Sequence, residues 1–249
     1  MDERAGGRGG VGTTDGDRQR RTGWFVVAGG VLLALVVALA VRPWDDGSAG
    51  PSQDAAVQVP RGSAAAATLV LDARAGDVRV AAGAAAGDLL DARGAGADAS
   101  ADHDGTGDEH EVRVTGTSAT VRLAGDVAWT LLLTVGADDV TLDLGELDVR
   151  AVEVAGGAGA VVLSLPAAAD TPRATVSAGV DTLAVRLVDG DAARVLVESG
   201  AGSATVDGTR TDGLGAGSEV TTDGLEVGGD HWEVVVAGGA GSITVDRAP

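Results

Sequence analysis

The chain has 249 residues, enough for a membrane segment followed by one domain of up to about 200 residues. It contains no Cys and no Lys, which excludes disulfides, thiol chemistry, Schiff-base lysines and a Walker-A nucleotide site. The formal net charge of −19 argues against nucleic acid as a partner, because such binding needs a basic surface.

Residues 24–41 form an uncharged apolar stretch, bracketed by Trp24 and Trp44. About 20 residues of helix rise about 30 Å, the thickness of a hydrocarbon core, so this stretch predicts one transmembrane helix. Three arginines lie shortly before it, and acidic residues follow it. The positive-inside rule therefore places residues 1–23 in the cytoplasm and the rest of the chain outside the cell membrane.

A cleaved signal peptide is the alternative interpretation of the same segment. Ala38-Leu39-Ala40 has the small-x-small form of a cleavage site. The long charged leader and the spanning length of the apolar stretch favour an uncleaved anchor. Both interpretations export the C-terminal part of the chain.

Residues 42–64 mix Pro, Gly, Ser and Asp without periodicity and are expected to be a flexible linker. From residue 65 to residue 247 the sequence alternates apolar and polar residues in short stretches, as in Val140-Thr141-Leu142-Asp143-Leu144. A period of two is typical of strands with one buried face. No stretch after Val41 shows a convincing helical stripe, so the fold class predicted for this extracytoplasmic domain is all-β.

Glycines recur at a nearly constant interval through this domain. They are Gly116, Gly136, Gly157, Gly179, Gly200 and Gly239. The successive steps are 20, 21, 22, 21 and 39 residues, and Gly76 lies 40 residues before the first, so the two long steps look like double periods. A constant period with two short strands per unit predicts a β-solenoid with rungs of about 20 residues, each stacked on its neighbour. Hairpins of a β-sandwich are the alternative.

The glycine-rich segments are expected to be structural turns and not binding loops. A phosphate-binding loop opens a helix, whereas a strand pattern follows Gly156-Gly157-Ala158-Gly159, and no Lys is present. The three Gly-Ala-Gly-Ser segments lack the later Gly of a nucleophile elbow. No spacing singles out a pair of acids for glycoside hydrolysis. We therefore assign no catalytic residue, nucleotide or cofactor.

An acidic segment, residues 97–111, holds the only metal-ligand candidates, Asp102, Asp104 and Asp108. Oxygen-rich loops bind Ca²⁺, but the EF-hand spacing is not met here. Two histidines seven residues apart in the same segment lack the helix of a typical zinc site. The simpler interpretation is a solvated acidic loop between rungs.

Trp129 and Trp232 each open an apolar strand pattern. Both are expected to fill the core or close its end. The alternative is that one of them contacts a partner or stacks on a sugar.

Two long segments, Thr68–Gly94 and Trp129–Pro166, resemble the toastrack domain. The second carries Trp129, Gly136-Ala137, Leu142-Asp143-Leu144, Leu147, Val149, Gly157 and Pro166 in the order typical of that family. The segment His231–Val245 fits a last rung, so the resemblance covers most of residues 65–247.

The resemblance implies a β-solenoid-like fold and a place in bacterial envelope-stress systems of the LiaF and phage-shock type. In those systems toastrack domains are attached to membrane segments and act in sensing or protein assembly, not catalysis. LiaF-type proteins have several membrane helices, whereas this chain has one predicted anchor. The leading hypothesis is a non-enzymatic, single-pass membrane protein that scaffolds envelope proteins or senses envelope stress. The alternatives are a cell-wall glycan-binding module and, less favoured, a hydrolase.

Overall fold

The computed structural model describes residues 54–188, 191–226 and 228–247. The predicted cytoplasmic tail 1–23, the membrane segment 24–41 and nearly all of the predicted linker lie outside these ranges. Within them no helix is long and apolar enough to cross a membrane. All regular elements of the described residues are strands, so the all-β prediction is confirmed.

The strands, in chain order, are β1 (Ala55–Pro60), β2 (Ala66–Arg74), β3 (Asp77–Ala82), β4 (Asp88–Ala95), β5 (Ser100–Thr106), β6 (Glu109–Thr115), β7 (Ser118–Leu123), β8 (Ala128–Asp143), β9 (Asp148–Leu165), β10 (Arg173–Val176), β11 (Val180–Leu187), β12 (Ala193–Val197), β13 (Ala201–Val206), β14 (Thr209–Leu214), β15 (Ser218–Thr221), β16 (Trp232–Val236) and β17 (Ala240–Arg247).

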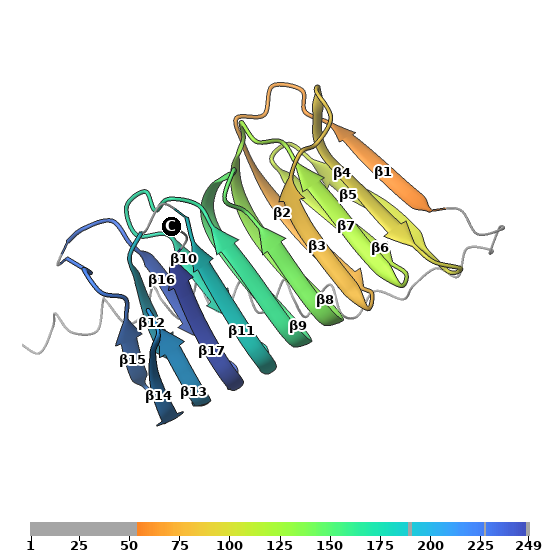
Figure 1. Cartoon of the computed structure of the whole chain (residues 1–249). Helices are drawn as coiled ribbons and strands as arrows, with labels where there is room; N and C mark the ends of the chain where they lie inside the picture. Colours follow the sequence, from red (N-terminus) through yellow and green to blue (C-terminus); the bar gives the residue numbers. More distant parts are fainter. Residues whose placement is uncertain (1–53, 189–190, 227, 248–249) are drawn as a thin grey trace, which may run out of the picture. The chain divides into compact units, whose positions relative to one another are not determined.

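The strands are arranged as a stack of rungs, where a rung is one passage of the chain along a first face, round a corner and along a second face. On the first face the strand order is β5–β6–β2–β8–β9–β10–β16–β12–β15. On the second face it is β1–β4–β7–β3–β8–β9–β11–β17–β13–β14. The long strands β8 and β9 bend at the corner and serve both faces. Figure 1 shows the strands side by side, from β1 at one end to β14 and β15 at the other.

The core lies between the two faces and is built mainly from Val, Leu and Ala. Because side chains alternate along a strand, β8 turns Leu131, Leu133, Val140 and Leu142 inward, and all four are at most 1% exposed. Parallel pairing in register places equivalent residues in rows through the stack, such as Leu133 beside Val154. One hydrophobic cluster runs through all rungs. Burying each such side chain contributes roughly 1.5–3 kcal/mol.

The order of the rungs differs from their order in the sequence. The rung β6–β7 lies outside β2–β3, and the last rung, β16–β17, is inserted between β10–β11 and β12–β13. The expectation that each rung stacks on its sequence neighbour therefore holds only in the middle of the stack. At both ends the chain first forms strands farther out in the stack and only later the rung inside them. β4 and β5 precede the rung β6–β7 that lies between them and β2–β3, and β12–β15 precede the rung β16–β17.

Antiparallel strands terminate the parallel stack at each end. β4 and β5 pair with β7 and β6 at one end, and β14 and β15 pair with β13 and β12 at the other. Antiparallel neighbours can be joined by a short turn, and Asp207-Gly208 joins β13 to β14 with φ of 47° and 76°. These are the values of a type I′ hairpin turn, for which Asp-Gly is a preferred sequence.

The folded domain begins earlier than the sequence predicted. β1 lies within the expected linker 42–64, yet it pairs antiparallel with β4 from Ala55 to Pro60. Val59 is 6% exposed and belongs to the core. The boundary at residue 65 is therefore wrong: Ala55, Val57 and Val59 alternate with more exposed residues along β1, but this short pattern lies among Pro, Gly, Ser and Asp residues that are typical of a linker.

Candidate functional site

Both tryptophans proposed as partner contacts are buried. Trp129 and Trp232 are each 0% exposed. The indole Nε1 of Trp129 donates a hydrogen bond to the carbonyl oxygen of Ala124 at 2.9 Å, and that of Trp232 donates to Pro166 at 2.8 Å. The alternative role, contact with a partner or stacking on a sugar, is therefore wrong for these two residues. They fill the core and fix the connections that precede β8 and follow β9.

The recurrent glycines lie where each rung passes from the first face to the second. Gly116, Gly179, Gly200 and Gly239 lie between the two strands of a rung, and Gly136 and Gly157 lie inside β8 and β9.

The strongest steric requirement falls on the glycines that precede Gly157 and Gly239. A Cβ on Gly156 would overlap the carbonyl oxygen of Val135, and one on Gly238 would overlap that of Ala178. At Gly157 and Gly239 a Cβ would meet nothing within 4 Å. Gly156 also has φ of 99°, which side chains disfavour.

The acidic segment 97–111 is a hairpin and not a loop, so that expectation is corrected. β5 contains Asp102 and Asp104, which pair with Arg113 and Glu111 of β6, and Asp108 lies in the turn between the strands. Strand alternation was hidden here because the outward side of the hairpin is almost entirely charged. Among the described residues no group of three or more His, Asp or Glu side chains is arranged to hold a metal ion, and these three aspartates do not form one.

Two histidines meet on the inner side of this hairpin. The rings of His103 and His110 are stacked, with centroids 5.4 Å apart, and Nε2 of His103 lies 3.1 Å from Nδ1 of His110. His110 is 6% exposed, and its Nε2 has no hydrogen-bond partner in the described structure. Burial lowers the pKa of His110, and the neighbouring His103 lowers it further. The backbone of Gly107 and the carboxylate of Asp108 act in the opposite direction. A proton on His110 is therefore unfavourable in the folded state.

We expect His110 to make the domain less stable as the pH falls. The unfolded chain takes up a proton near pH 6.5, whereas the folded chain does so only at the lowered pKa. The free energy of unfolding should therefore decrease as the pH falls through 6.5 and level off below the folded-state pKa. His110→Phe should flatten this part of the profile, measured by urea unfolding at a series of pH values.

The matched control for this experiment is His231→Phe. The His231 ring is half-buried, and its Nδ1 lies 2.8 Å from the carbonyl oxygen of Gly229. Burial raises the pKa of Asp72 and of Glu153, and a raised carboxyl pKa makes the folded state more stable as the pH falls. This contribution is the same in the unmodified chain and in both variants, so it cancels in the comparison. If His110→Phe and His231→Phe gave the same slope as the unmodified chain, the His pair would have no role in acid sensitivity.

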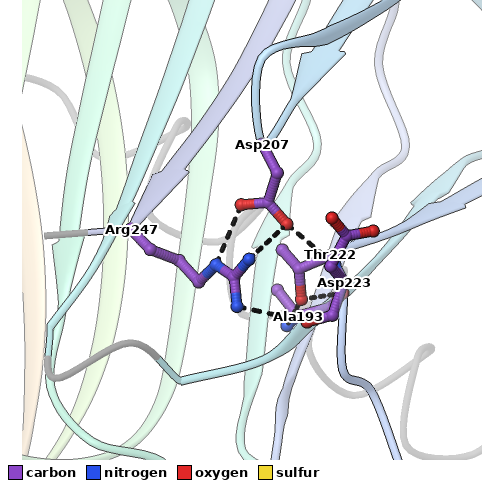
Figure 2. A network of polar contacts seen from close by, with 5 residues as sticks. All are labelled: Ala193, Asp207, Thr222, Asp223 and Arg247. Carbon is purple, nitrogen blue, oxygen red and sulfur yellow. Dashed lines mark hydrogen bonds and ion pairs between the residues drawn. The ribbon is translucent and has the colours of Figure 1, made fainter. Parts of the chain in front are cut away.

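A polar network lies at the end of the stack that contains β14 and β15, and it joins Arg247, Asp207 and Asp223 (Figure 2). The guanidinium of Arg247, at the end of β17, donates to both carboxylate oxygens of Asp207, from Nε at 2.9 Å and from Nη2 at 2.8 Å. Asp207 also accepts the backbone N–H of Asp223 at 2.8 Å, and Arg247 donates to the carbonyl oxygen of Asp223 at 3.1 Å. The buried hydroxyl of Thr222 accepts the backbone N–H of Ala193 at 2.9 Å. The network joins the inserted rung to the terminal strands.

Arg247→Ala should destabilise the domain by about 1–3 kcal/mol, because it leaves the nearly buried carboxylate of Asp207 without its bidentate partner. Arg210→Ala is the control: its ion pair with Asp212 is 64% and 71% exposed, and such pairs contribute about 0–1 kcal/mol. Thermal unfolding of both variants measures the difference. Equal effects would show that the network does not hold the inserted rung.

Four terminal strands have one neighbour each within the described residues: β1, β5, β14 and β15. β1 and β5 also contact each other across the end of the stack. On β14 the first five residues, Thr209–Gly213, are all exposed. An edge strand offers unpaired backbone groups to a further strand, so β14 is the most accessible docking edge in the described part of the chain.

The comparison with protein families agrees with this architecture. The model described as the N-terminal domain of toast_rack, DUF2154, matches residues 48–186, which is more than half of the chain. The chain belongs to the toast_rack N-terminal domain family. The match begins before β1 and ends within β11, and the strands from β12 to β17 extend the same toastrack stack beyond the matched residues.

No curated protein matches this toastrack chain in sequence. Among solved structures, it is similar to the crystal structure at 1.95 Å of a "putative cell adhesion protein" from Clostridium sporogenes ATCC 15579. The two chains share 14% sequence identity, with a TM-score of 0.62 over 79% of this chain and 100% of the other. At this level of identity the similarity shows a common fold alone.

Two features of the toastrack domain were not predicted from the sequence, the buried His110 and the edge strand β14. Strand alternation places His110 on the same side as Val112 and Val114, which is the available signal that this histidine is buried. The Asp207-Gly208 pair, flanked by apolar residues on one side, is a hairpin signal that would have revealed β14. The recurrence of glycines every 20–22 residues shows neither the burial of His110 nor the turn at Asp207-Gly208.

Proposed function

We propose that this toastrack protein is a non-enzymatic, single-pass membrane protein whose β-solenoid lies outside the cell and binds an envelope protein. The predicted anchor at residues 24–41 and the arginines before it support this orientation. Membership of the toast_rack family supports a role in envelope-stress sensing or assembly of the LiaF and phage-shock type. The similarity to the cell adhesion protein supports a binding role in place of a reaction.

The observation that carries the proposal is the exposed edge strand β14. A two-residue turn makes Val206 and Thr209 a hydrogen-bonded pair, so pairing then alternates along the antiparallel ladder with β13. The backbone N–H and C=O groups of Arg210 and Asp212 consequently point away from β13 and toward the open edge. An extended segment of a partner can add to these groups as a further strand.

The charges on β14 influence which strands can pair with its open edge. Arg210 and Asp212 form an ion pair on the strand, with Nε and Oδ1 2.8 Å apart. Charged side chains on edge strands disfavour indiscriminate pairing between copies. A partner that places an acidic residue beside Arg210 and a basic residue beside Asp212 complements this edge, as does a second copy of the chain paired antiparallel about Thr211.

The test is site-specific photocrosslinking in native membranes. A photoreactive residue at Thr211, on β14, should give a discrete protein adduct of the full-length chain. The same residue at Asp139, exposed in the middle of the second face, is the matched control and should give none. An adduct with wall fragments alone, or equal adducts from both positions, would contradict the proposal.

Asp212→Pro tests the mode of binding. Proline removes the N–H that points to the open edge and leaves the ladder between β13 and β14 intact, since edge strands tolerate proline at such positions. The adduct from Thr211 should disappear while the thermal unfolding of the domain is almost unchanged. Persistence of the adduct in this variant would show that the partner does not bind as a strand.

A further inference from the structure

A small polar pocket lies on the outer side of the second face, where the described domain begins. Its volume is about 210 Å³. It is lined by Asp91 and Arg93 of β4, by Ser118, Thr120 and Arg122 of β7, and by Asp54, which precedes β1. The register of β4 and β7 pairs Asp91 with Arg122 and Arg93 with Thr120. Alternate residues share a side of a sheet, so these four side chains belong to the same outer surface.

One ion pair in the pocket is already complete. Asp91 is 5% exposed and accepts two hydrogen bonds from Arg93, from Nε at 3.0 Å and from Nη2 at 2.8 Å. A bidentate pair with a buried carboxylate fixes the plane of the guanidinium. Arg93 and Asp91 therefore form a wall of the pocket, and their charges offset each other.

The remaining charged residues of the pocket, Arg122 and Asp54, are of opposite sign, and the charge of Asp54 also acts on Arg93 from a distance. In the described structure no ion pair or side-chain hydrogen bond involves Arg122 or Asp54. Arg122 lies on β7, and Asp54 precedes the strand that flanks β4 on the other side. The hydroxyls of Ser118 and Thr120 supply further donors and acceptors.

The balance of charge decides which ligand class fits. The chain carries a formal charge of −19, so a free anion is repelled by the rest of the molecule. A simple cation can bind many other carboxylates on the surface, and the positive charge of Arg122 would repel it from this pocket. A ligand with one carboxylate and one ammonium group matches Arg122 and Asp54 together. We propose that this pocket binds a zwitterionic amino acid or short peptide, with its carboxylate on Arg122 and its ammonium on Asp54.

Occupancy of this pocket has a structural consequence for β1. The ligand bridges β7 to the residue before β1, across β4, and so holds the first strand against the stack. β1 is an edge strand, and it connects the domain to the predicted membrane anchor. Binding should therefore slow amide hydrogen exchange in residues 55–59. This inference does not depend on the edge strand β14, which lies at the other end of the stack.

The test uses the full-length chain in detergent and four related probes. They are alanyl-alanine, its N-acetyl form, its C-terminal amide and the doubly blocked form. Titration calorimetry should show saturable binding of alanyl-alanine, with at least about tenfold weaker binding after loss of either charge, since each charge-assisted contact is worth about 1.4 kcal/mol or more. Inorganic phosphate should not compete.

Two variants with matched controls locate the site. Arg122→Gln and Asp54→Asn should each weaken binding of alanyl-alanine about tenfold or more. Arg186→Gln is the control for the first, because Arg186 is exposed in the same row of the second face, beyond β3, β8 and β9. Asp77→Asn, an exposed residue of β3, is the control for the second.

Several outcomes would overturn the inference. They are equal affinity for all four probes, undiminished binding by Arg122→Gln, absence of saturable binding, or Arg122-dependent binding of phosphate. Hydrogen exchange distinguishes local from global effects, because both variants should keep the protection of β8 and β9 while losing the ligand-dependent protection of β1. Failure here would leave photocrosslinking at β14 unaffected.

Discussion

Gly156→Ala should destabilise the domain by about 2–5 kcal/mol, whereas Gly157→Ala, one residue later, should change its stability by less than about 1 kcal/mol. The methyl group at position 156 would overlap the carbonyl oxygen of Val135, which belongs to the backbone of the neighbouring rung and cannot rotate away. The φ of 99° at this position adds conformational strain for any residue with a Cβ. Overpacking and strain each cost about 1–3 kcal/mol.

Gly157 provides the control because its Cβ would enter open space and its φ is not positive. Urea unfolding followed by circular dichroism measures both variants. If the two were equally stable, the close approach of the rungs at this corner would be wrong. If Gly156→Ala failed to fold, Gly156→Ala in a chain stabilised by an osmolyte would still report the difference through its unfolding midpoint.

Trp232→Ala should cost about 3–5 kcal/mol, the range for removing a fully buried aromatic side chain. The indole fills the core at the start of β16, and its loss also leaves the carbonyl oxygen of Pro166 without a donor. Trp232→Phe should cost less, since it keeps most of the packing and loses the hydrogen bond, which is worth about 0.5–1.5 kcal/mol. Thermal unfolding of the two variants separates the packing contribution from the hydrogen bond.

Leu196→Ala is a suitable comparison for Trp232→Ala. Leu196 lies on β12, the strand beside β16, but its side chain faces outward and is half-buried. Its truncation should therefore have a much smaller effect. A Trp232→Ala variant as stable as Leu196→Ala would contradict the placement of Trp232 in the core and would reopen a role for this residue in binding.

Strand alternation and the glycine period were sufficient to predict an all-β domain. The patterns of β8, β11 and β12 are regular because each strand has one face in a continuous core. The period of 20–22 residues arises because each rung contains two strands and one corner, and the corner allows little room for side chains. These constraints are local, so they are visible in a single sequence.

The order of the rungs could not be predicted, because the period does not say which rungs are neighbours. The steps of 40 residues to Gly116 and of 39 residues to Gly239 look like double periods. Each of these steps contains two strands that pair antiparallel with the outermost rung: β4 and β5 pair with β7 and β6, and β14 and β15 pair with β13 and β12. Pairing between distant segments depends on long-range contacts that no local pattern records.

The candidate sites were harder to predict than the fold. The pocket near Asp54 combines residues from three segments of the chain, which only the register of β4 with β1 and β7 brings together. The alternative role of Trp129 and Trp232 as partner contacts was wrong, because in a core made mainly of Val, Leu and Ala these two large side chains fill space that the smaller ones leave.

The insertion of β16 and β17 has a consequence for the timing of assembly. These strands contain residues 232–247, which the ribosome makes after all the rungs they separate. Until they emerge, β10 and β11 on one side and β12 and β13 on the other have no partner across the gap. The C-terminal half therefore cannot mature in step with synthesis. A nascent chain halted after β13 but before residue 232 would hold both flanking rungs without the rung that separates them.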